Sequence, residues 1–424
     1  HYYIWRKPKD DGSVPNNFHS YFGGSGWEFD EESGEYYFHQ FSKRQPDLNW
    51  ENSQVQAEIH KMMNWWLDKG IGGFRMDVID LIGKDVDNEI MADGPQLHHL
   101  LQQMNRATFG QRDVLTVGET WSATPETAKL YSDPARNELS MVFQFEHITI
   151  GYHPQHGKWQ PQPFDLIKLK QVFNKWQTAL VDSGWNSLFW NNHDLPRIVS
   201  KYGDPGLFRV ESAKMLATTL HFMQGTPYIY QGEEIGMTNV RFPKIEDYQD
   251  IESLNLYSER TEAGVPAEEM MEGIYTNGRD NARTPMQWSN EANGGFSRVS
   301  PWLKVNPNYT EINVEAALND PDSIFFHYQK LIALRKNKPI ITWGKYQQLL
   351  EAHQEVFAYQ RILDNEHIVV ISNFCGHQVQ LPLPAEIRNI EGEWLIGNYP
   401  PRHGLAEEIT LQPYESFAIS WLNN

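Results

Sequence analysis

The stretch Gly-Ile-Gly-Gly-Phe-Arg-Met-Asp-Val-Ile-Asp, residues 70–80, decides how the fold of this chain is interpreted. Apolar residues alternate with small or charged ones over 72–78, which predicts a buried strand. Arg75 and Asp77 stand two apart and therefore share one face of that strand. A guanidinium beside a carboxylate orients it and keeps it ionised. The pair is either part of a catalytic site or an internal ion pair that closes the strand.

A helix is predicted directly before this strand. Its apolar residues recur at helical spacing and define one face, which comprises Val55, Ile59, Met62, Met63 and Trp66. Gly70 follows at the position where many helices end in a left-handed residue. We therefore expect the helix to stop at this glycine and the strand to begin shortly after it.

Two other apolar runs also end in acidic residues. Residues 114–118 lead directly to Glu119, and residues 187–190 lead to Asn191-Asn192-His193-Asp194. Helical patterns lie between these runs, as in a parallel barrel, where the carboxyl ends of all strands converge on the face that carries the active site. Three acidic residues at three strand ends favour a catalytic site over a set of structural ion pairs.

The alternating pattern predicts an α/β fold of the (β/α)8 TIM-barrel type. Five barrel strands, each followed by a helix, are expected at about 72–78, 113–118, 141–145, 186–191 and 226–231. Residues 231–302 are polar and are predicted to be irregular, and residues 323–335 to form the last barrel helix. From Pro339 onward, runs at 356–361, 367–373 and 416–421 predict the strands of a small antiparallel β domain.

Three motifs resemble signature regions of the alpha-amylase superfamily of glycoside hydrolases. They are Gly-Phe-Arg-Met-Asp at 73–77, Gly-Glu-Thr at 118–120 and Asn-Asn-His-Asp at 191–194. Two more, Gln-Gly-Glu-Glu-Ile-Gly-Met at 231–237 and Arg-Asp-Asn-Ala-Arg-Thr-Pro-Met-Gln-Trp at 279–288, resemble the oligo-1,6-glucosidase and dextran glucosidase (glucan 1,6-alpha-glucosidase) branch. The resemblance runs from the first residues to the last.

The resemblance implies a domain organisation. We expect residues 1–50 to be the tail of a small inserted domain, 51–337 to carry barrel strands four to eight, and 338–424 to form the C-terminal β domain. The first three strands would then lie in a segment of about a hundred residues before residue 1. A structural calcium, which some relatives hold, would belong to that segment, so we expect no metal or cofactor in residues 1–424.

Hydrolysis of a glycosidic bond needs two carboxyl groups with different tasks. Asp77, beside Arg75, suits the ionised nucleophile. Glu119 is flanked by Val117, Thr120 and Trp121, and a drier site would raise its pKa and suit the general acid. The resemblance implies these same roles. It also implies that Asp194, next to His193, stabilises the transition state and holds sugar hydroxyls, and that Arg279 binds the hydroxyls at the far side of the sugar.

Linkage specificity is expected to depend on residues beside these carboxyl groups. Val78 follows the nucleophile, and relatives that cut alpha-1,6 links typically have valine there, whereas alpha-1,4 enzymes typically have threonine. Trp121 and Lys158 resemble the dextran-glucosidase branch, and Lys158 and Glu252 would contact the second sugar. The leading hypothesis is a retaining exo-glucosidase that acts on alpha-1,6-linked glucose at the non-reducing ends of isomalto-oligosaccharides or dextran.

Other functions remain open. A trehalose-6-phosphate hydrolase or a sucrose isomerase would share the fold, but the former should show a cluster of basic residues for the phosphate, and we find none that is convincing. A non-catalytic binding subunit would lack the three carboxylates, which are all present here. A further alternative is that this chain is an inactive fragment of an active enzyme. Glu233-Glu234 could reach the site or cap the following turn, and His98-His99 lacks the spacing of a metal site.

The composition limits the partners. The sequence has 36 Lys and Arg against 55 Asp and Glu, a formal net charge of −19. Nucleic acids and anionic membranes repel such a protein, and no run of about 18 apolar residues could span a bilayer. The one cysteine, Cys375, fits a reducing compartment. We therefore expect a cytoplasmic monomer whose only partner is an oligosaccharide substrate.

Overall fold

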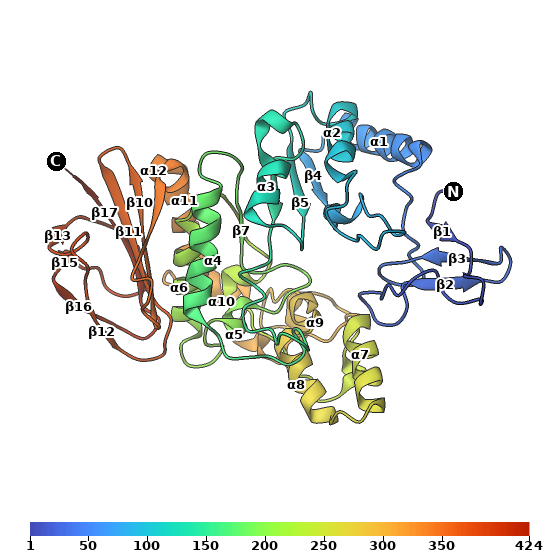
Figure 1. Cartoon of the computed structure of the whole chain (residues 1–424). Coiled ribbons are helices and arrows are strands. Elements are labelled where there is room, and N and C mark those ends of the chain that lie inside the picture. Colours follow the sequence, from blue (N-terminus) through green and yellow to red (C-terminus); the bar gives the residue numbers. More distant parts are fainter. Residues whose placement is uncertain (424) are drawn as a thin grey trace. The chain divides into compact units, whose positions relative to one another are not determined.

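Two units make up the structure, a computed structural model that describes residues 1–423. The first unit contains residues 1–145, 182–185 and 254–260, and the second contains residues 146–181, 186–253 and the chain from 261 onward. Figure 1 shows the elements of both, and each unit is described by itself below. Among the described residues, none of the helices combines the length and the apolar character needed to cross a membrane.

The first unit begins with a small antiparallel sheet in the strand order β1-β3-β2. Its strands are β1 (Trp5–Arg6), β2 (Trp27–Asp30) and β3 (Glu35–Phe38). Trp27 and Phe38 pack edge to face, with ring centroids 5.0 Å apart, and form a core with Ile4 and Val86. Many of the aromatic residues of this segment therefore serve its own packing.

Helix α1 (Ser53–Asp68) leads into the parallel part of the first unit. The Asn52 side chain accepts the Gln54 N–H at its start, and Gly70 ends it with φ 86°, as predicted. The buried stripe consists of Val55, Met63 and Leu67. The prediction that Met62 and Trp66 belong to the buried face is wrong, because both side chains are 45% exposed. The buried residues are spaced eight and four positions apart, and this row does not include positions 62 and 66.

Three parallel strands follow: β4 (Gly73–Met76), β5 (Leu115–Glu119) and β6 (Met141–Phe143), in that order across the sheet. In the register, Met76 pairs with Gly118 and Glu119 with Phe143. Helices α2 (Leu97–Ala107) and α3 (Pro125–Ser132) connect them. Because β4 and β5 are parallel neighbours, Asp77 and Glu119 lie at the same edge of the sheet, as predicted.

In the second unit, β7 (Ser187–Phe189) and β8 (Thr226–Tyr228) form a parallel pair. They are preceded and connected by α4 (Leu166–Ala179), α5 (Ile198–Lys201) and α6 (Arg209–His221). All ten residues from Ser212 to His221 in α6 are buried, so this helix is covered on every side. The two remaining barrel strands predicted from the sequence are thus present.

The segment after β8 is more helical than predicted. It contains α7 (Ile251–Glu262), α8 (Ala267–Asn277) and α9 (Asp280–Arg283). The prediction of an irregular 231–302 is therefore wrong for these parts, because short apolar stripes such as Met270 and Ile274 in α8 suffice once tertiary packing covers them. The chain continues through α10 (Val314–Asn319), α11 (Ile324–Asn337) and α12 (Pro339–Trp343).

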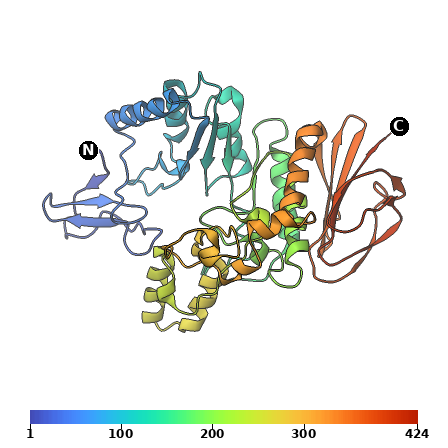
Figure 2. The same ribbon diagram turned by 180° about the vertical axis from the view of Figure 1, so that it is seen from behind.

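The C-terminal part of the second unit is an antiparallel β structure. Its five-stranded sheet has the order β14-β17-β11-β10-β9, and α4 and α6 contact strands of this sheet (Figures 1 and 2). The strands are β9 (Lys345–Leu349), β10 (Val356–Leu363), β11 (Glu366–Asn373), β14 (Glu393–Gly397) and β17 (Ser416–Leu422). Two small sheets pair β12 (Val379–Pro382) with β16 (Glu408–Leu411), and β13 (Ile390–Glu391) with β15 (Gly404–Leu405).

Candidate active site

Close contact between strands β4 and β5 positions the first part of the site. Gly73 has φ 145°, and a Cβ atom there would lie 1.8 Å from the carbonyl oxygen of Leu115. Only glycine fits such an approach. The next residues of β4 then run beside β5, so that Arg75 and Asp77 reach the edge at which Glu119 ends its own strand.

Arg75 bridges the two predicted catalytic carboxyl groups. Its Nη1 forms an ion pair with Asp77 Oδ1, and its Nη2 lies 2.7 Å from Glu119 Oε2. The Asp77 side chain is 75% exposed, whereas that of Glu119 is 4% exposed. One guanidinium thus holds an accessible carboxylate beside a buried carboxyl group, the asymmetry that a nucleophile and a general acid need.

The surroundings of Glu119 favour its protonated form. Burial raises the pKa of this carboxyl group, and the negative charge of Asp77 adds to the increase. The Arg75 charge and the Val78 N–H, 3.3 Å from Oε2, oppose it without cancelling it. The Trp121 indole N–H donates to Oε1 across 3.2 Å. A carboxyl group in this setting can retain a proton and deliver it to a leaving oxygen.

Val78 and Trp121 flank the pair. Val78 has φ 36° and ψ 47°, a left-handed conformation that is rare for a β-branched residue. This conformation turns its N–H toward Glu119. The Trp121 ring stacks on Phe145, with centroids 3.8 Å apart and planes at 8°, and it is 45% exposed. Its fixed plane could receive one face of a sugar ring.

The predicted residues of the second unit form another charged cluster around Asp194. His193 Nε2 lies 3.0 Å from Asp194 Oδ2, and Arg279 Nη1 lies 3.4 Å from Oδ1. Arg283 Nη2 lies only 2.5 Å from the same Oδ1, and its Nε donates to the His193 carbonyl at 2.9 Å. Two arginines and a histidine therefore fix the orientation of this carboxylate.

Two further acidic residues, Asp250 and Glu252, bind the Arg279 guanidinium. Its Nε and Nη2 donate to Asp250 Oδ1 at 2.9 and 2.5 Å, and Nε lies 3.2 Å from Glu252 Oε2. That same Glu252 oxygen accepts from Lys158 Nζ at 2.8 Å. The predicted second-sugar residues Lys158 and Glu252 thus form one ion-pair chain with Arg279.

Two participants were not predicted from the sequence. Arg283 lies within the 279–288 motif, one helical turn after Arg279, but the motif alone indicates no role for it. Asp250, whose side chain is fully buried, pairs with Arg279 and is the second of these residues. Its position two residues before Glu252 is the only signal in the sequence. The sequence does not indicate the pairing with Arg279, because Arg279 lies 29 residues further along the chain.

The weaker sequence candidates have structural partners. Glu233 is buried and accepts hydrogen bonds from Asn191 Nδ2 at 2.6 Å and Tyr328 Oη at 2.5 Å. It therefore connects the end of β7 with α11. His98 Nδ1 lies 2.7 Å from Glu138 Oε2, a carboxyl group that is fully buried. Neither contact involves the predicted catalytic residues.

Comparison with protein-family models gives two matches. A model described as "Alpha amylase, catalytic domain" matches residues 1–344, and a model described as "Alpha-amylase SusG C-terminal domain" matches residues 356–417. The first model covers more than half of the chain. Together they confirm the predicted fold class, a TIM-barrel catalytic region followed by an antiparallel β domain.

Individual relatives agree with these models. A palatinase of Erwinia rhapontici is 61% identical over 421 residues, which cover 99% of this chain and 76% of the relative. An oligo-1,6-glucosidase of Parageobacillus thermoglucosidasius is 53% identical over 432 residues, covering 98% and 76%. A crystal structure of Bacillus licheniformis trehalose-6-phosphate hydrolase superimposes with a TM-score of 0.93 at 47% identity, covering 100% of this chain and 78% of that one.

Proposed function

Since this chain belongs to the alpha-amylase family of glycoside hydrolases, we propose that it is a retaining, exo-acting alpha-glucosidase. Its substrates would be isomalto-oligosaccharides or dextran, from which it removes alpha-1,6-linked glucose at non-reducing ends. The observation that carries the proposal is the unequal carboxyl pair joined by Arg75: an exposed Asp77 and a buried Glu119 with a raised pKa.

The proposed reaction has two steps. Asp77 attacks the anomeric carbon of the terminal glucose while Glu119 gives its proton to the departing glycosidic oxygen, which leaves a glucosyl ester on Asp77. Glu119, now ionised, takes a proton from a water molecule that attacks the same carbon and releases glucose. Each step inverts the configuration at the anomeric carbon, so the two steps together retain it. In this scheme Asp194 stabilises the positive charge that develops on the sugar ring.

The proposed linkage preference rests on the neighbours of the pair and on the relatives. Val78 offers no side-chain hydrogen bond beside the nucleophile, and the oligo-1,6-glucosidase relative carries the linkage in its name. The palatinase relative makes palatinose the second substrate to test. Lys158 and Glu252, paired at 2.8 Å, would hydrogen-bond the second sugar.

A second candidate is hydrolysis of trehalose 6-phosphate, favoured by the similarity to the B. licheniformis enzyme. A phosphate would need positive charge that is not already neutralised. Lys158, Arg279 and Arg283 each contact a carboxylate instead. This pairing supports a neutral substrate, and with it the first candidate.

The test combines a substrate panel with the anomeric outcome. The purified protein is given isomaltotriose, palatinose, maltotriose, sucrose and trehalose 6-phosphate, and the first glucose formed is followed by proton NMR. We expect cleavage of the first two, with the alpha anomer appearing first. Initial beta-glucose would exclude retention, and a clear preference for trehalose 6-phosphate would replace the proposed substrate.

The residue assignment has its own check. Glu119→Gln should reduce kcat by about 10²–10⁴-fold and change KM little, because the amide cannot donate the proton. The matched control is Glu58→Gln, the same change on the exposed face of α1. If both variants keep full activity, Glu119 is not the acid. The same proposal includes a monomeric state, which light scattering can check, and a cytoplasmic location, which cell fractionation can check.

A further inference from the structure

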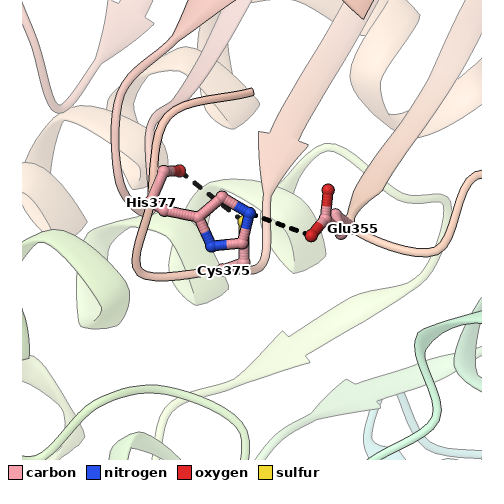
Figure 3. Close-up of side chains that lie close together, drawn as sticks. All are labelled: Glu355, Cys375 and His377. Atoms are coloured by element: carbon pink, nitrogen blue, oxygen red, sulfur yellow. Dashed lines mark hydrogen bonds and ion pairs between the residues drawn. The ribbon is translucent and has the colours of Figure 1, made fainter. Parts of the chain in front are cut away.

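Outside the candidate active site, three side chains that can bind a metal ion meet in the C-terminal β structure. Glu355 directly precedes β10, and Cys375 and His377 lie in the turn that follows β11. Figure 3 shows the three side chains together, with a dashed line that joins the His377 ring to the Glu355 carboxylate. None of the three takes part in the reaction proposed above.

The ligand atoms lie at distances that suit a tetrahedral ion. His377 Nε2 is 3.0 Å from Glu355 Oε1 and 3.5 Å from Cys375 Sγ, and all three ligand atoms lie within 4.8 Å of one another. With bonds of about 2.0–2.3 Å, ligand atoms around tetrahedral zinc are separated by roughly 3.3–3.8 Å. Small side-chain rotations would therefore place all three on one ion.

We propose that Glu355, Cys375 and His377 bind a divalent cation of the zinc type. The sulfur, the neutral imidazole Nε2 and one carboxylate oxygen would supply three bonds, and a water molecule the fourth. The side chains of His377 and Glu355 are 63% and 40% exposed, so solvent can reach the fourth position. A thiolate and a carboxylate together balance the two positive charges of the ion.

The turn is organised before any ion arrives. Asn373 Oδ1 accepts the Cys375 backbone N–H at 3.1 Å and the thiol at 2.9 Å, while its Nδ2 donates to the carbonyls of His377 and Gln412, both at 2.9 Å. The Phe374 N–H donates to the Glu355 carbonyl at 2.8 Å. These bonds fix the spacing of all three ligands, which lowers the entropy that binding would otherwise cost.

Metal binding breaks one covalent bond, the S–H bond of Cys375. The Cys375 thiol, now hydrogen-bonded to Asn373, loses its proton to solvent as the sulfur–metal bond forms, and no oxidation occurs. His377 exchanges its contact with Glu355 for a bond to the same ion that Glu355 binds. The ion would then connect the residue before β10 to the turn after β11.

The single cysteine makes the site easy to observe. Cobalt(II) replaces zinc in tetrahedral sites, and a thiolate on cobalt gives a charge-transfer band in the near ultraviolet. In this sequence such a band can arise only from Cys375. Titration of chelator-treated, tag-free protein with Co²⁺ should produce the band with one equivalent, and Zn²⁺ should remove it by displacement.

Substitutions test the individual ligands. Cys375→Ser should abolish the band, and His377→Gln and Glu355→Gln should each raise the Kd for Co²⁺ by about tenfold or more. The control is His403→Gln, an exposed histidine of the same β structure, which should leave the titration unchanged. Circular dichroism of each variant verifies that it folds.

A second measurement follows the thiol directly. Zn²⁺ should slow alkylation of Cys375 by iodoacetamide in the unaltered protein and in His403→Gln, but not in His377→Gln. The proposal is overturned if no charge-transfer band forms. It is also overturned if the band forms but keeps its Kd in both His377→Gln and Glu355→Gln, since the cysteine would then bind the ion without these two ligands.

Discussion

At the scale of single residues, the chemistry depends on how unequal two carboxyl groups are. Asp77 and Glu119 share the Arg75 guanidinium, yet one is exposed and the other buried. Burial raises the pKa of Glu119 despite the adjacent positive charge. Desolvation, rather than the identity of the residue, therefore assigns the acid role.

The residue after the proposed nucleophile should influence the linkage. Val78→Thr keeps a β-branched shape in the left-handed conformation at φ 36° but adds a hydroxyl group beside Asp77. One hydrogen bond is worth about 0.5–1.5 kcal/mol, so the ratio of alpha-1,4 to alpha-1,6 cleavage should rise about two- to twelvefold. The measurement is glucose release from maltotriose against isomaltotriose. An unchanged ratio would mean that the linkage preference depends on Trp121 and Lys158 and not on Val78.

Asp250 is expected to act through Arg279. Burial pushes the pKa of the Asp250 carboxyl group upward, but the hydrogen bonds and charge of Arg279 bring it below the ordinary value, so this carboxylate is ionised in the folded protein. Asp250→Asn removes that charge without changing the shape. Because a hydrogen bond to a charged group is worth about 1.5–3 kcal/mol, kcat/KM should fall about 10–150-fold.

The matched control for this prediction is Asp247→Asn. Asp247 pairs with Lys304, whose side chain is 62% exposed, and loss of a pair with one solvent-exposed partner should alter kcat/KM by less than about twofold. The KM and kcat of both variants are compared at equal folded fraction. Equal effects of the two substitutions would show that Asp250 contributes to the fold and does not position Arg279.

At the scale of elements, a buried carboxyl group connects three segments. Glu233, in the short helical turn after β8, bonds to Asn191 after β7 and to Tyr328 in α11. Burial raises its pKa from 4.5 to about 7. A raised acid pKa means that the folded state binds the proton more tightly than the unfolded state, so this contribution to stability is largest at low pH and declines as pH rises toward 7.

Stability should therefore depend on pH through Glu233. Between about pH 4.5 and about pH 8 the decline amounts to about 3 kcal/mol. Glu233→Gln, which cannot ionise, should show a correspondingly flatter profile of the unfolding free energy. Urea unfolding of both proteins across this range measures the difference. Parallel profiles would mean that Glu233 is not the titrating group.

At the scale of the whole molecule, the net charge of −19 should distinguish neutral from anionic substrates. An uncharged oligosaccharide is not steered, so kcat/KM for isomaltotriose should change less than about twofold between about 0.01 and 0.15 M salt. A phosphorylated sugar would be repelled, and salt would increase its kcat/KM by screening. A strong salt dependence with isomaltotriose would contradict this expectation.

Much of the fold could be predicted from the sequence because it depends on local periodicity. Alternation over 72–78, the glycine stop at Gly70 and the acidic residues after three apolar runs are visible without a structure. The five barrel strands and the main C-terminal strands occur where predicted. Strands and helices produce sequence patterns of period 2 and period 3.6, because the direction in which a side chain points depends only on its position within its own element.

The contacts between residues that are distant in the sequence depend on the tertiary structure. Arg283 meets Asp194 across 89 positions and Arg279 meets Asp250 across 29. The local sequence pattern predicts neither the exposure of Trp66 on α1 nor the presence of helices α7 to α9. Both depend on which surface the fold packs against each face of a helix. The positions of the carboxyl groups at strand ends, in contrast, can be predicted from the sequence alone. The burial that raises the pKa of Glu119 arises only when β4, β5 and their neighbours pack around it, because desolvation is a property of the folded surroundings.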